Sequence, residues 1–275
     1  MKNLEGKVAI ITGAGSGIGR ALGEEMARRG AYLVVSDVNR DRIEEVGESI
    51  EKAGGKVKTL TLDVSCFDAV KKMVDHTAAE HGRIDYIFNN AGIVVGGEAR
   101  DISIEDWRTV IDVNLYGVIN GVAAVYPIMA KQGFGHVVNL GSIEGLVPFP
   151  GTASYVGSKY GVVGLSNSLR IEAEPLGVKV SVVCPGHIKT SIFQDARVVK
   201  LDRDKMLFWM TASPGMTPGK CALKILRGVE RNKAVIVITN TARILWYMYR
   251  ICPGLVFLVM KIGYRKIMPD VYIDD

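Results

Sequence analysis

Apolar runs and amphipathic segments alternate along most of this chain. The apolar runs are short and rich in Val and Ile, which is typical of strands that are buried on both faces of a sheet. Strands are expected at Val8–Thr12, Tyr32–Asp37, Val57–Asp63, Ile84–Asn89, His136–Ser142, Val178–Cys184 and Ala234–Thr239. Helices are expected at Ile18–Arg29, Arg40–Ala53, Ser65–Glu80, Ile104–Lys131 and Tyr155–Glu174, with a further helix beginning at Thr217–Pro218.

Strands that alternate with helices predict a parallel sheet, because a helix is the usual crossover between parallel neighbours. Right-handed crossovers then favour an α/β doubly wound fold, the Rossmann fold. We expect one domain over residues 1–240, with a substrate lid at about 187–215, and a C-terminal extension over 241–275. A length of 275 residues and a hydrophobic share of 48% suffice for one large core.

Composition argues against several other kinds of protein. The net charge is +5, from 34 basic and 29 acidic residues, and it is spread thinly over most of the chain, so no nucleic-acid partner is expected. The four cysteines are far apart and the four histidines have no ligand spacing, so no disulfide framework and no metal site are expected. The N-terminus has no apolar signal segment, which favours a cytoplasmic location.

A glycine-rich turn joins the first expected strand to the first helix. It reads Thr12-Gly13-Ala14-Gly15-Ser16-Gly17-Ile18-Gly19. Glycines at 13, 17 and 19 lack the Cβ that would block a tight turn or the close approach of a pyrophosphate. The helix that begins here offers N–H groups and the positive end of its dipole to that anion. The position between a strand and a helix therefore predicts a dinucleotide site.

Two acidic residues follow the second and third strands. Asp37 lies eighteen residues after Gly19, where a carboxylate can accept the adenosine ribose hydroxyls and repel a 2′-phosphate, so NAD is preferred to NADP. Arg40 lies near enough to weaken that preference. Asp63 could accept the adenine amino group. The alternative is a loop-capping role for Asp37 and a helix-capping role for Asp63.

Tyr155 and Lys159 are four residues apart and share one face of an expected helix. An ammonium beside a phenol favours the phenolate, so a group with a pKa of about 10 could exchange a proton near neutrality. Ser142, thirteen residues before the tyrosine, could hydrogen-bond a substrate oxygen. These three residue types are those that a hydride-transfer enzyme needs for proton exchange with an alcohol.

Together these motifs closely resemble the short-chain dehydrogenase/reductase family over about residues 5–240. The family's Asn-Asn-Ala-Gly motif matches Asn89 through Gly92, and its catalytic asparagine, serine, tyrosine and lysine fall on Asn114, Ser142, Tyr155 and Lys159. The resemblance implies that Tyr155 acts as acid or base, that Lys159 lowers its pKa and binds ribose, and that Asn114 interrupts its helix and holds a water. The cofactor contacts implied by these motifs are Gly13, Ser16, Gly17, Ile18, Gly19, Asp37, Asp63, Val64, Asn90, Ala91, Gly92, Tyr155, Lys159, Pro185, Gly186, Ile188 and Thr190.

The resemblance also locates the substrate pocket, at 93–95, at 144–149 and in the lid. Apolar side chains dominate these stretches: Val94, Val95, Leu146, Val147, Phe149, Ile192, Phe193, Met206, Phe208 and Trp209. They favour a hydrophobic alcohol or ketone, although about half of them could simply pack the lid on the domain. The expected substrate contacts are Ser142, Glu144, Tyr155, Val94, Phe149 and Phe193, with a solvated loop carboxylate as the favoured alternative for Glu144.

The C-terminal extension is apolar, aromatic and basic. Residues 242–266 contain a charge-free run, Ile251–Met260, bounded by Arg250 and Lys261. Arg250 and the Pro253-Gly254 break argue against a spanning helix, but the composition suits peripheral contact with a membrane interface. The favoured account is that the segment packs over the substrate pocket or against another subunit.

The sequence therefore predicts an NAD-dependent oxidoreductase that acts on a secondary alcohol or its ketone, with a lipid-like or steroid-like substrate. Within the family, the alternative is an NADPH-dependent 3-ketoacyl-type reductase. In another class, the alternative is a non-catalytic NAD-binding regulatory protein or a membrane-associated scaffold. The resemblance also implies a homodimer or homotetramer formed through the helices that carry Asn114 and Tyr155.

Overall fold

The computed structural model describes residues 3–211 and 215–273. Its centre is a sheet of seven parallel strands in the order β3-β2-β1-β4-β6-β7-β9. The strands are β1 Val8–Thr12, β2 Tyr32–Asp37, β3 Lys56–Thr61, β4 Tyr86–Asn89, β6 Gly135–Leu140, β7 Val178–Pro185 and β9 Val235–Ile238. The expected doubly wound α/β fold is confirmed, and β1 and β4 are the neighbours at which the strand order reverses.

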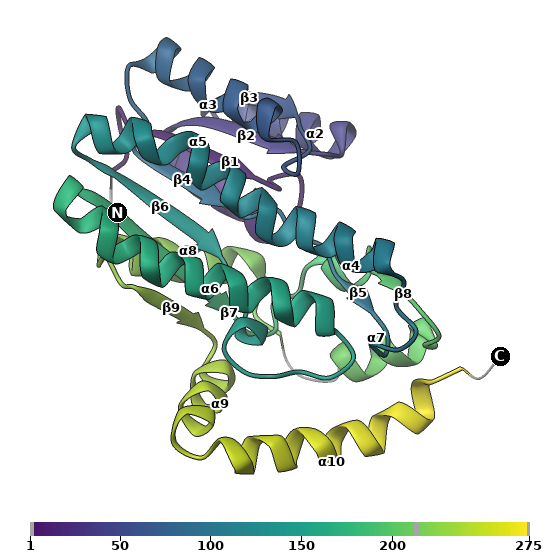
Figure 1. Cartoon of the computed structure of the whole chain (residues 1–275). Helices are drawn as coiled ribbons and strands as arrows, with labels where there is room; N and C mark the ends of the chain where they lie inside the picture. The colour runs from purple at the N-terminus through teal and green to yellow at the C-terminus, as the bar shows by residue number, and fades with distance from the viewer. Residues whose placement is uncertain (1–2, 212–214, 274–275) are drawn as a thin grey trace.

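Helices cover both faces of this sheet (Figure 1). One face carries α1 Gly17–Arg28, α2 Arg40–Lys52 and α8 Pro218–Glu230. The other carries α3 Phe67–His81, α4 Ile104–Ile111, α5 Gly117–Gln132 and α6 Ala153–Ala173. Two buried apolar layers result, one on each side, because the Val and Ile side chains of each strand alternate between them.

The helix expected over Ile104–Lys131 is interrupted. A π-helical segment, Asp112–Tyr116, lies between α4 and α5 and carries Asn114 at its middle. The whole stretch Ile104–Gln132 is the one helical stretch of the described chain that is long and apolar enough to span a membrane, and half of its apolar window is buried in the domain. Burial of this helical stretch in the domain core explains its apolar composition.

The lid contains three short elements that the sequence pattern does not reveal. They are a 3-10 turn at Ser191–Phe193, the strand β8 at Arg197–Val198 and the helix α7 at Arg203–Thr211. β8 pairs with β5, Val95–Gly96, so the lid is joined to the loop after the Asn-Asn-Ala-Gly motif. Residues 212–214 of the expected lid lie outside the described residues.

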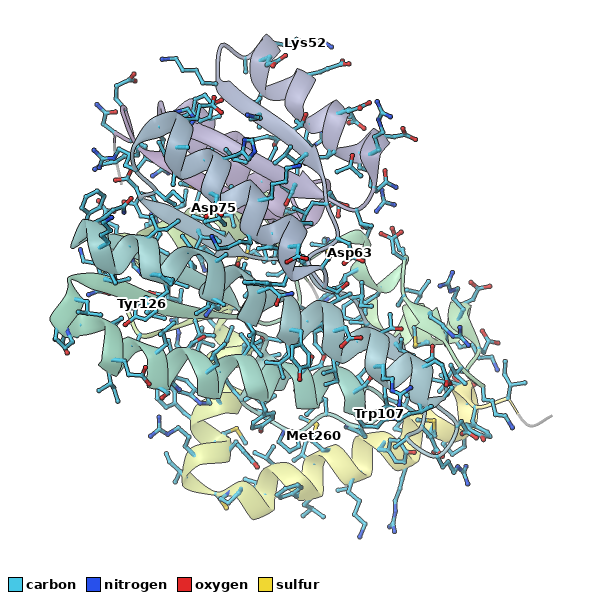
Figure 2. All side chains as sticks on the ribbon, turned by 45° about the horizontal axis from the view of Figure 1, so that its top comes forward. Lys52, Asp63, Asp75, Trp107, Tyr126 and Met260 are labelled. Atoms are coloured by element: carbon cyan, nitrogen blue, oxygen red, sulfur yellow. The ribbon has the colours of Figure 1, made fainter. Side chains whose placement is uncertain are left out.

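The C-terminal extension forms two helices, α9 Asn240–Ile251 and α10 Pro253–Val271, along one edge of the molecule (Figure 1). Val256 of α10 is fully buried in the core cluster of the α5–α6 face. Figure 2 shows Met260 on the side of α10 that faces the domain. The end of α10 is tied to the lid, where Asp202 donates its N–H to Val271 O at 2.7 Å. The extension therefore packs on its own domain.

Candidate active site

One cavity of about 1040 Å³ opens at the carboxyl ends of the central strands. Of the residues expected to contact cofactor or substrate, those that line it are Gly13, Ser16, Gly17, Ile18, Asp37, Asp63, Val64, Asn90, Ala91, Gly92, Val94, Ser142, Glu144, Phe149, Tyr155, Lys159, Pro185, Gly186, Ile188, Thr190 and Phe193. The other two expected residues, Gly19 and Asn114, lie directly behind this lining. The fold thus brings segments from the whole chain to one place.

The glycine loop is packed so closely that side chains would not fit. A Cβ at Gly13, whose φ is +63°, would lie 2.6 Å from Ala91 Cα, and one at Gly19 would lie 2.2 Å from Gly13 O. Asn90 secures the loop by donating from Nδ2 to Thr12 O at 2.9 Å and to Gly13 O at 2.8 Å. The N-cap of α1, Ser16, makes no side-chain cap hydrogen bond, so the helix begins without a side-chain cap where Ser16, Gly17 and Ile18 line the cavity. These residues fit a pyrophosphate.

Asp37 ends β2 and points at the glycine loop. Its Oδ2 accepts from Gly15 N at 2.9 Å, and its Oδ1 accepts from Asn39 N at 2.9 Å. Both nearby arginines are paired with other carboxylates. Arg40 is bound to Glu44 at 2.7 Å and Arg42 to Asp195 at 2.9 Å. Within the described residues, neither of these arginines forms an ion pair with Asp37.

Asp63 forms side-chain hydrogen bonds within the loop that precedes α3. Its Oδ1 accepts from Ser65 N at 2.9 Å and from Ser65 Oγ at 2.8 Å. The N-cap of α3 is Cys66, so the helix-capping role expected as the alternative for Asp63 is wrong. Asp63 still lines the cavity beside Val64, and Figure 2 labels it at the end of the molecule where the strands finish.

Tyr155 and Lys159 lie together on α6 and are both buried. Lys159 Nζ is 5.5 Å from the centroid of the Tyr155 ring and donates to Leu140 O at 2.8 Å. Ser142 follows β6 and hydrogen-bonds the Tyr155 hydroxyl, while its Oγ accepts from Glu144 N at 3.1 Å. A hydroxyl, a phenol and an ammonium are therefore grouped at one side of the cavity.

The direction of the Tyr155 pKa differs from the expectation. Burial raises the pKa of the phenol above its usual value, the Glu144 carboxylate raises it further, and the Ser142 hydrogen bond opposes this only in part. Burial also lowers the pKa of Lys159 to about 8. The pKa of Tyr155 is therefore raised and not lowered as expected, because desolvation of the buried phenolate is the largest effect.

Asn114 is fully buried and connects three elements of the site. Its Oδ1 accepts from Ile93 N at 2.8 Å, and its Nδ2 donates to Ile93 O at 2.9 Å and to Ser158 Oγ at 3.1 Å. A Cβ on Gly92 would lie 3.2 Å from Asn114 Oδ1 and 3.4 Å from Lys159 Nζ. The π-helical turn allows this packing because it displaces Asn114 from the regular helical ladder.

The substrate side of the cavity is apolar, with one acid. Glu144 is half-buried there, accepts from Thr152 Oγ1 at 2.6 Å, and has a pKa raised by burial to about 7. It is not a solvated loop carboxylate. Of the ten apolar residues expected to form the walls, five line the cavity: Val94, Phe149, Ile192, Phe193 and Met206.

The other expected wall residues serve different purposes. Leu146 and Val147 belong to the domain core, and Val95 packs in a small cluster with Tyr155. Phe208 is 67% exposed, so it does not reach the substrate side, and the Trp209 side chain lies outside the described residues. Helix α10 supplies wall residues instead, among them Met260, Tyr264 and Ile267.

Several polar residues support the site without having been expected there. Thr12 Oγ1 accepts from Asn90 N at 3.0 Å and from Ala91 N at 3.2 Å. Ser158 accepts from Asn114 and donates to Tyr155 O at 2.7 Å. Ser158 lies three residues after Tyr155, so helical spacing places it near the same face of α6. The spacing alone does not show that Asn114 lies opposite this face.

The chain is similar to known oxidoreductases along its whole length. The sequence profile of the short chain dehydrogenase family matches residues 7–199. The SadH protein of Mycobacterium tuberculosis (strain CDC 1551 / Oshkosh), which is named as an oxidoreductase, is 34% identical over 273 residues, or 98% of this chain and 99% of that one. The cyclohexanol dehydrogenase of Acinetobacter sp. (strain SE19) is 38% identical over 201 residues, or 71% of this chain and 79% of that one.

A solved structure gives the same result. The short chain dehydrogenase/reductase of Burkholderia phymatum in complex with NAD superposes with a TM-score of 0.85 at 29% identity, covering 93% of this chain and 96% of that one. Fold, glycine loop and cavity define a dinucleotide-binding oxidoreductase. The chain belongs to the short-chain dehydrogenase/reductase family. Solved relatives are named with NAD or with NADP, so membership supports a nicotinamide cofactor without choosing between them.

Proposed function

We propose that this protein transfers a hydride between NAD(H) and a hydrophobic secondary alcohol or its ketone. The observation that carries the proposal is the grouping of Ser142, Tyr155 and Lys159 at one cavity, between the glycine loop and an apolar wall. The glycine loop fits the pyrophosphate, and Tyr155 is near enough to Ser142 for both hydroxyls to bind one substrate oxygen.

Each residue of this group has a distinct task. Ser142 orients the substrate oxygen, and Tyr155 gives that oxygen a proton in ketone reduction or takes one from it in alcohol oxidation. Lys159 binds the nicotinamide ribose and stabilises the phenolate, and Asn114 holds the water that connects Lys159 to solvent. When bound, the nicotinamide ring donates or accepts the hydride, and its oxidised form adds a positive charge.

The electrostatics of the protein's own residues favour ketone reduction over alcohol oxidation. Because burial keeps the Tyr155 phenol protonated, the chain alone is ready to donate a proton to a ketone. Alcohol oxidation requires the phenolate, so it depends more on the positive charges of Lys159 and the oxidised cofactor. The resemblance implies that Lys159 stabilises the phenolate, and we assign this role to the enzyme with NAD⁺ bound.

NAD is preferred in this proposal because of Asp37. Its carboxylate is held at the glycine loop, where it can accept ribose hydroxyls and repel a 2′-phosphate. The two arginines that could bind a 2′-phosphate, Arg40 and Arg42, are each paired with a carboxylate.

A hydrophobic substrate is supported by the wall composition. Phe149, Phe193 and Val94 come from three separate loops, and Met260 and Ile267 close the cavity from α10. Burial of apolar surface against such walls contributes about 25 cal/mol per Å². Among the described residues, Glu144 is the acid on this side, so it would contact a polar group of the substrate other than the reacting oxygen.

We also propose that the protein is a homodimer or homotetramer that acts in the cytoplasm. Members of the family are typically oligomeric. On α6, Ile171 is 75% exposed and a Cβ on Gly164 would meet no other atom, so this helix has room for a partner. The mass of the protein by light scattering in solution tests this assignment, and a monomer would contradict it.

The catalytic proposal is tested by steady-state oxidation of secondary alcohols of graded size, with NAD⁺ and NADP⁺ in parallel. We expect kcat/KM to rise with apolar size and to be higher with NAD⁺. A kcat/KM about tenfold higher with NADP⁺ than with NAD⁺ would contradict the cofactor assignment. Such a ratio corresponds to about 1.4 kcal/mol in favour of NADP⁺. Absence of turnover with every alcohol and with the matching ketones, despite bound NAD, would favour a regulatory protein instead.

A further inference from the structure

The outer side of the two C-terminal helices is apolar and open to solvent. It carries Ile244, Tyr247 and Ile251 from α9 and Leu255, Leu258 and Ile262 from α10, whose exposed fractions lie between 44% and 83%. We call these six residues the tail face. Exposed side chains of this size are normal when they are scattered, but a contiguous set marks an interaction surface.

Helical spacing explains why the tail face is continuous. The α9 members recur at i, i+3 and i+7, and those of α10 at i, i+3 and i+7 from Leu255, so each set forms one stripe. The two stripes meet at the turn between Ile251 and Leu255. The opposite side of α10 packs inward through Val256 and Met260. The packing of the tail on its own domain therefore leaves the tail face exposed.

The charge around the tail face is mainly positive. Residues 241–269 contain five basic residues and no Asp or Glu, and Asp270, near the end of α10, lies 3.6 Å from Lys205 Nζ. They account for the whole net charge of +5, since the rest of the chain is balanced. On α10, Lys266 continues the stripe of Leu255, Leu258 and Ile262, and it is exposed, as are Lys261 and Arg265 beside it. An apolar stripe that continues into lysine and arginine is typical of helices that lie at an anionic membrane surface.

We propose that the tail face docks on the surface of an anionic lipid bilayer. A second copy of the chain is the competing occupant. In a two-fold contact the same patch meets itself, and the basic residues of this segment would then face each other, while Asp270, the acid of α10, is already paired with Lys205. An anionic lipid headgroup has the complementary charge, and the acyl region accepts the apolar stripe. Helix α10 has 19 residues and includes Lys261, Arg265 and Lys266, which suits a surface position in the bilayer.

The same helix forms a wall of the active-site cavity. Val259 lines the cavity and is also 49% exposed, and it lies beside Leu258 of the tail face. Docking would hold the apolar side of the cavity next to the lipid. An alcohol dissolved in the bilayer would then reach the cavity through an apolar passage. The docking surface itself does not depend on the proposed reaction.

Co-sedimentation of the full chain with lipid vesicles tests the proposal. We expect binding to vesicles of phosphatidylcholine mixed with phosphatidylglycerol, weaker binding at high salt, and weaker binding to phosphatidylcholine alone. The double substitution Leu258→Asp with Ile262→Asp should lower the bound fraction about tenfold, because both charges would enter the acyl region. Leu258→Ile with Ile262→Leu, which keeps the apolar area, should bind like the unchanged protein.

Two further variants complete the test. Phe67→Asp places a charge at an exposed apolar residue of α3, on the far side of the molecule (Figure 1), and should leave vesicle binding unchanged. The triple variant Lys261→Gln, Arg265→Gln and Lys266→Gln keeps the apolar stripe and should lose the preference for phosphatidylglycerol. This variant tests the docking proposal if the double aspartate variant does not fold. The proposal is overturned if the unchanged protein binds neither vesicle. It is also overturned if the aspartate variant binds as before, or if its only effect is to halve the mass in light scattering.

Discussion

Arg42 and Asp195 form an ion pair that joins the two sides of the cofactor end of the cavity. Arg42 Nη1 lies 2.9 Å from Asp195 Oδ2, and Nη2 lies 3.2 Å from Oδ1. Arg42 belongs to α2, close to Asp37, and Asp195 belongs to the lid. Both residues line the cavity. A half-exposed pair of this kind adds at most about 1 kcal/mol to stability, so its effect should appear in cofactor binding.

Asp195→Ala should therefore change cofactor choice. The freed Arg42 guanidinium can bind a 2′-phosphate bidentately, so we expect the ratio of kcat/KM with NADP⁺ to that with NAD⁺ to rise about fivefold. The matched control is Glu48→Ala, which frees Lys52, at the far end of α2, from its exposed pair. An equal rise in the control would show that the lid pair has no special role.

The pH dependence should differ between the two reaction directions. The folded chain raises the pKa of Tyr155, so the phenolate needed for oxidation forms only as the pH rises, and oxidation should increase with pH. Ketone reduction uses the protonated phenol and should fall over the same range. Initial rates in both directions, at saturating cofactor, check this.

Glu144→Gln should shift that profile. The Glu144 carboxylate raises the pKa of Tyr155, so its neutral replacement lowers that pKa and should move the rise of the oxidation rate to lower pH. Glu105→Gln, an exposed acid of α4, is the control and should leave the profile in place. A shift to higher pH in Glu144→Gln would contradict the electrostatic account.

The glycine loop should tolerate no side chain at its inner position. A Cβ in Gly19→Ala would lie 2.2 Å from Gly13 O, which requires the loop to move. We expect a loss of about 1–3 kcal/mol in the free energy of unfolding, and weaker NAD binding. Gly219→Ala, in an exposed turn of α8 where a Cβ meets nothing, should instead gain up to about 1 kcal/mol. Urea unfolding of both variants measures the difference.

Much of the fold can be predicted from the sequence because its determinants are local. Val8–Thr12 is an apolar run followed at once by a glycine turn and an amphipathic helix, and each feature by itself indicates its element. The order of the strands then follows from right-handed crossovers. The grouping of Gly13, Asp37, Ser142 and Tyr155 is predictable for the same reason, since each residue lies at or just beyond the carboxyl end of a strand or at the start of a helix.

The remaining features depend on contacts between distant segments. The resemblance implies that Asn114 interrupts its helix, and the π-helical turn confirms this, but the bonds to Ile93 and Ser158 that hold the turn are not revealed by any periodicity in 104–131. The raised pKa of Tyr155 comes from burial by several loops, whereas the spacing of Tyr155 and Lys159 shows only the ammonium. Phe208 was expected to line the pocket, but helix α7 directs it to solvent, and Met260, far along the chain, lines the pocket instead.

Shortening a side chain should have different effects on the two sides of α10. Met260→Ala removes apolar surface from the cavity wall, so we expect KM for a bulky hydrophobic alcohol to rise about five- to tenfold with little change in kcat. Leu258→Ala, on the tail face, should leave KM unchanged for alcohol dissolved in buffer. Equal KM values for the two variants would show that α10 does not contact the substrate.

The most direct test of the proposed catalysis is the kcat of Tyr155→Phe for alcohol oxidation, measured beside NAD binding by calorimetry. The proposal predicts that kcat falls about 10²- to 10⁴-fold while NAD still binds, because only the proton-transfer group is lost. Tyr160→Phe, on the same helix but with its hydroxyl directed at Tyr249, should keep nearly full activity. Undiminished oxidation by Tyr155→Phe would contradict the assignment of the phenol as the acid or base.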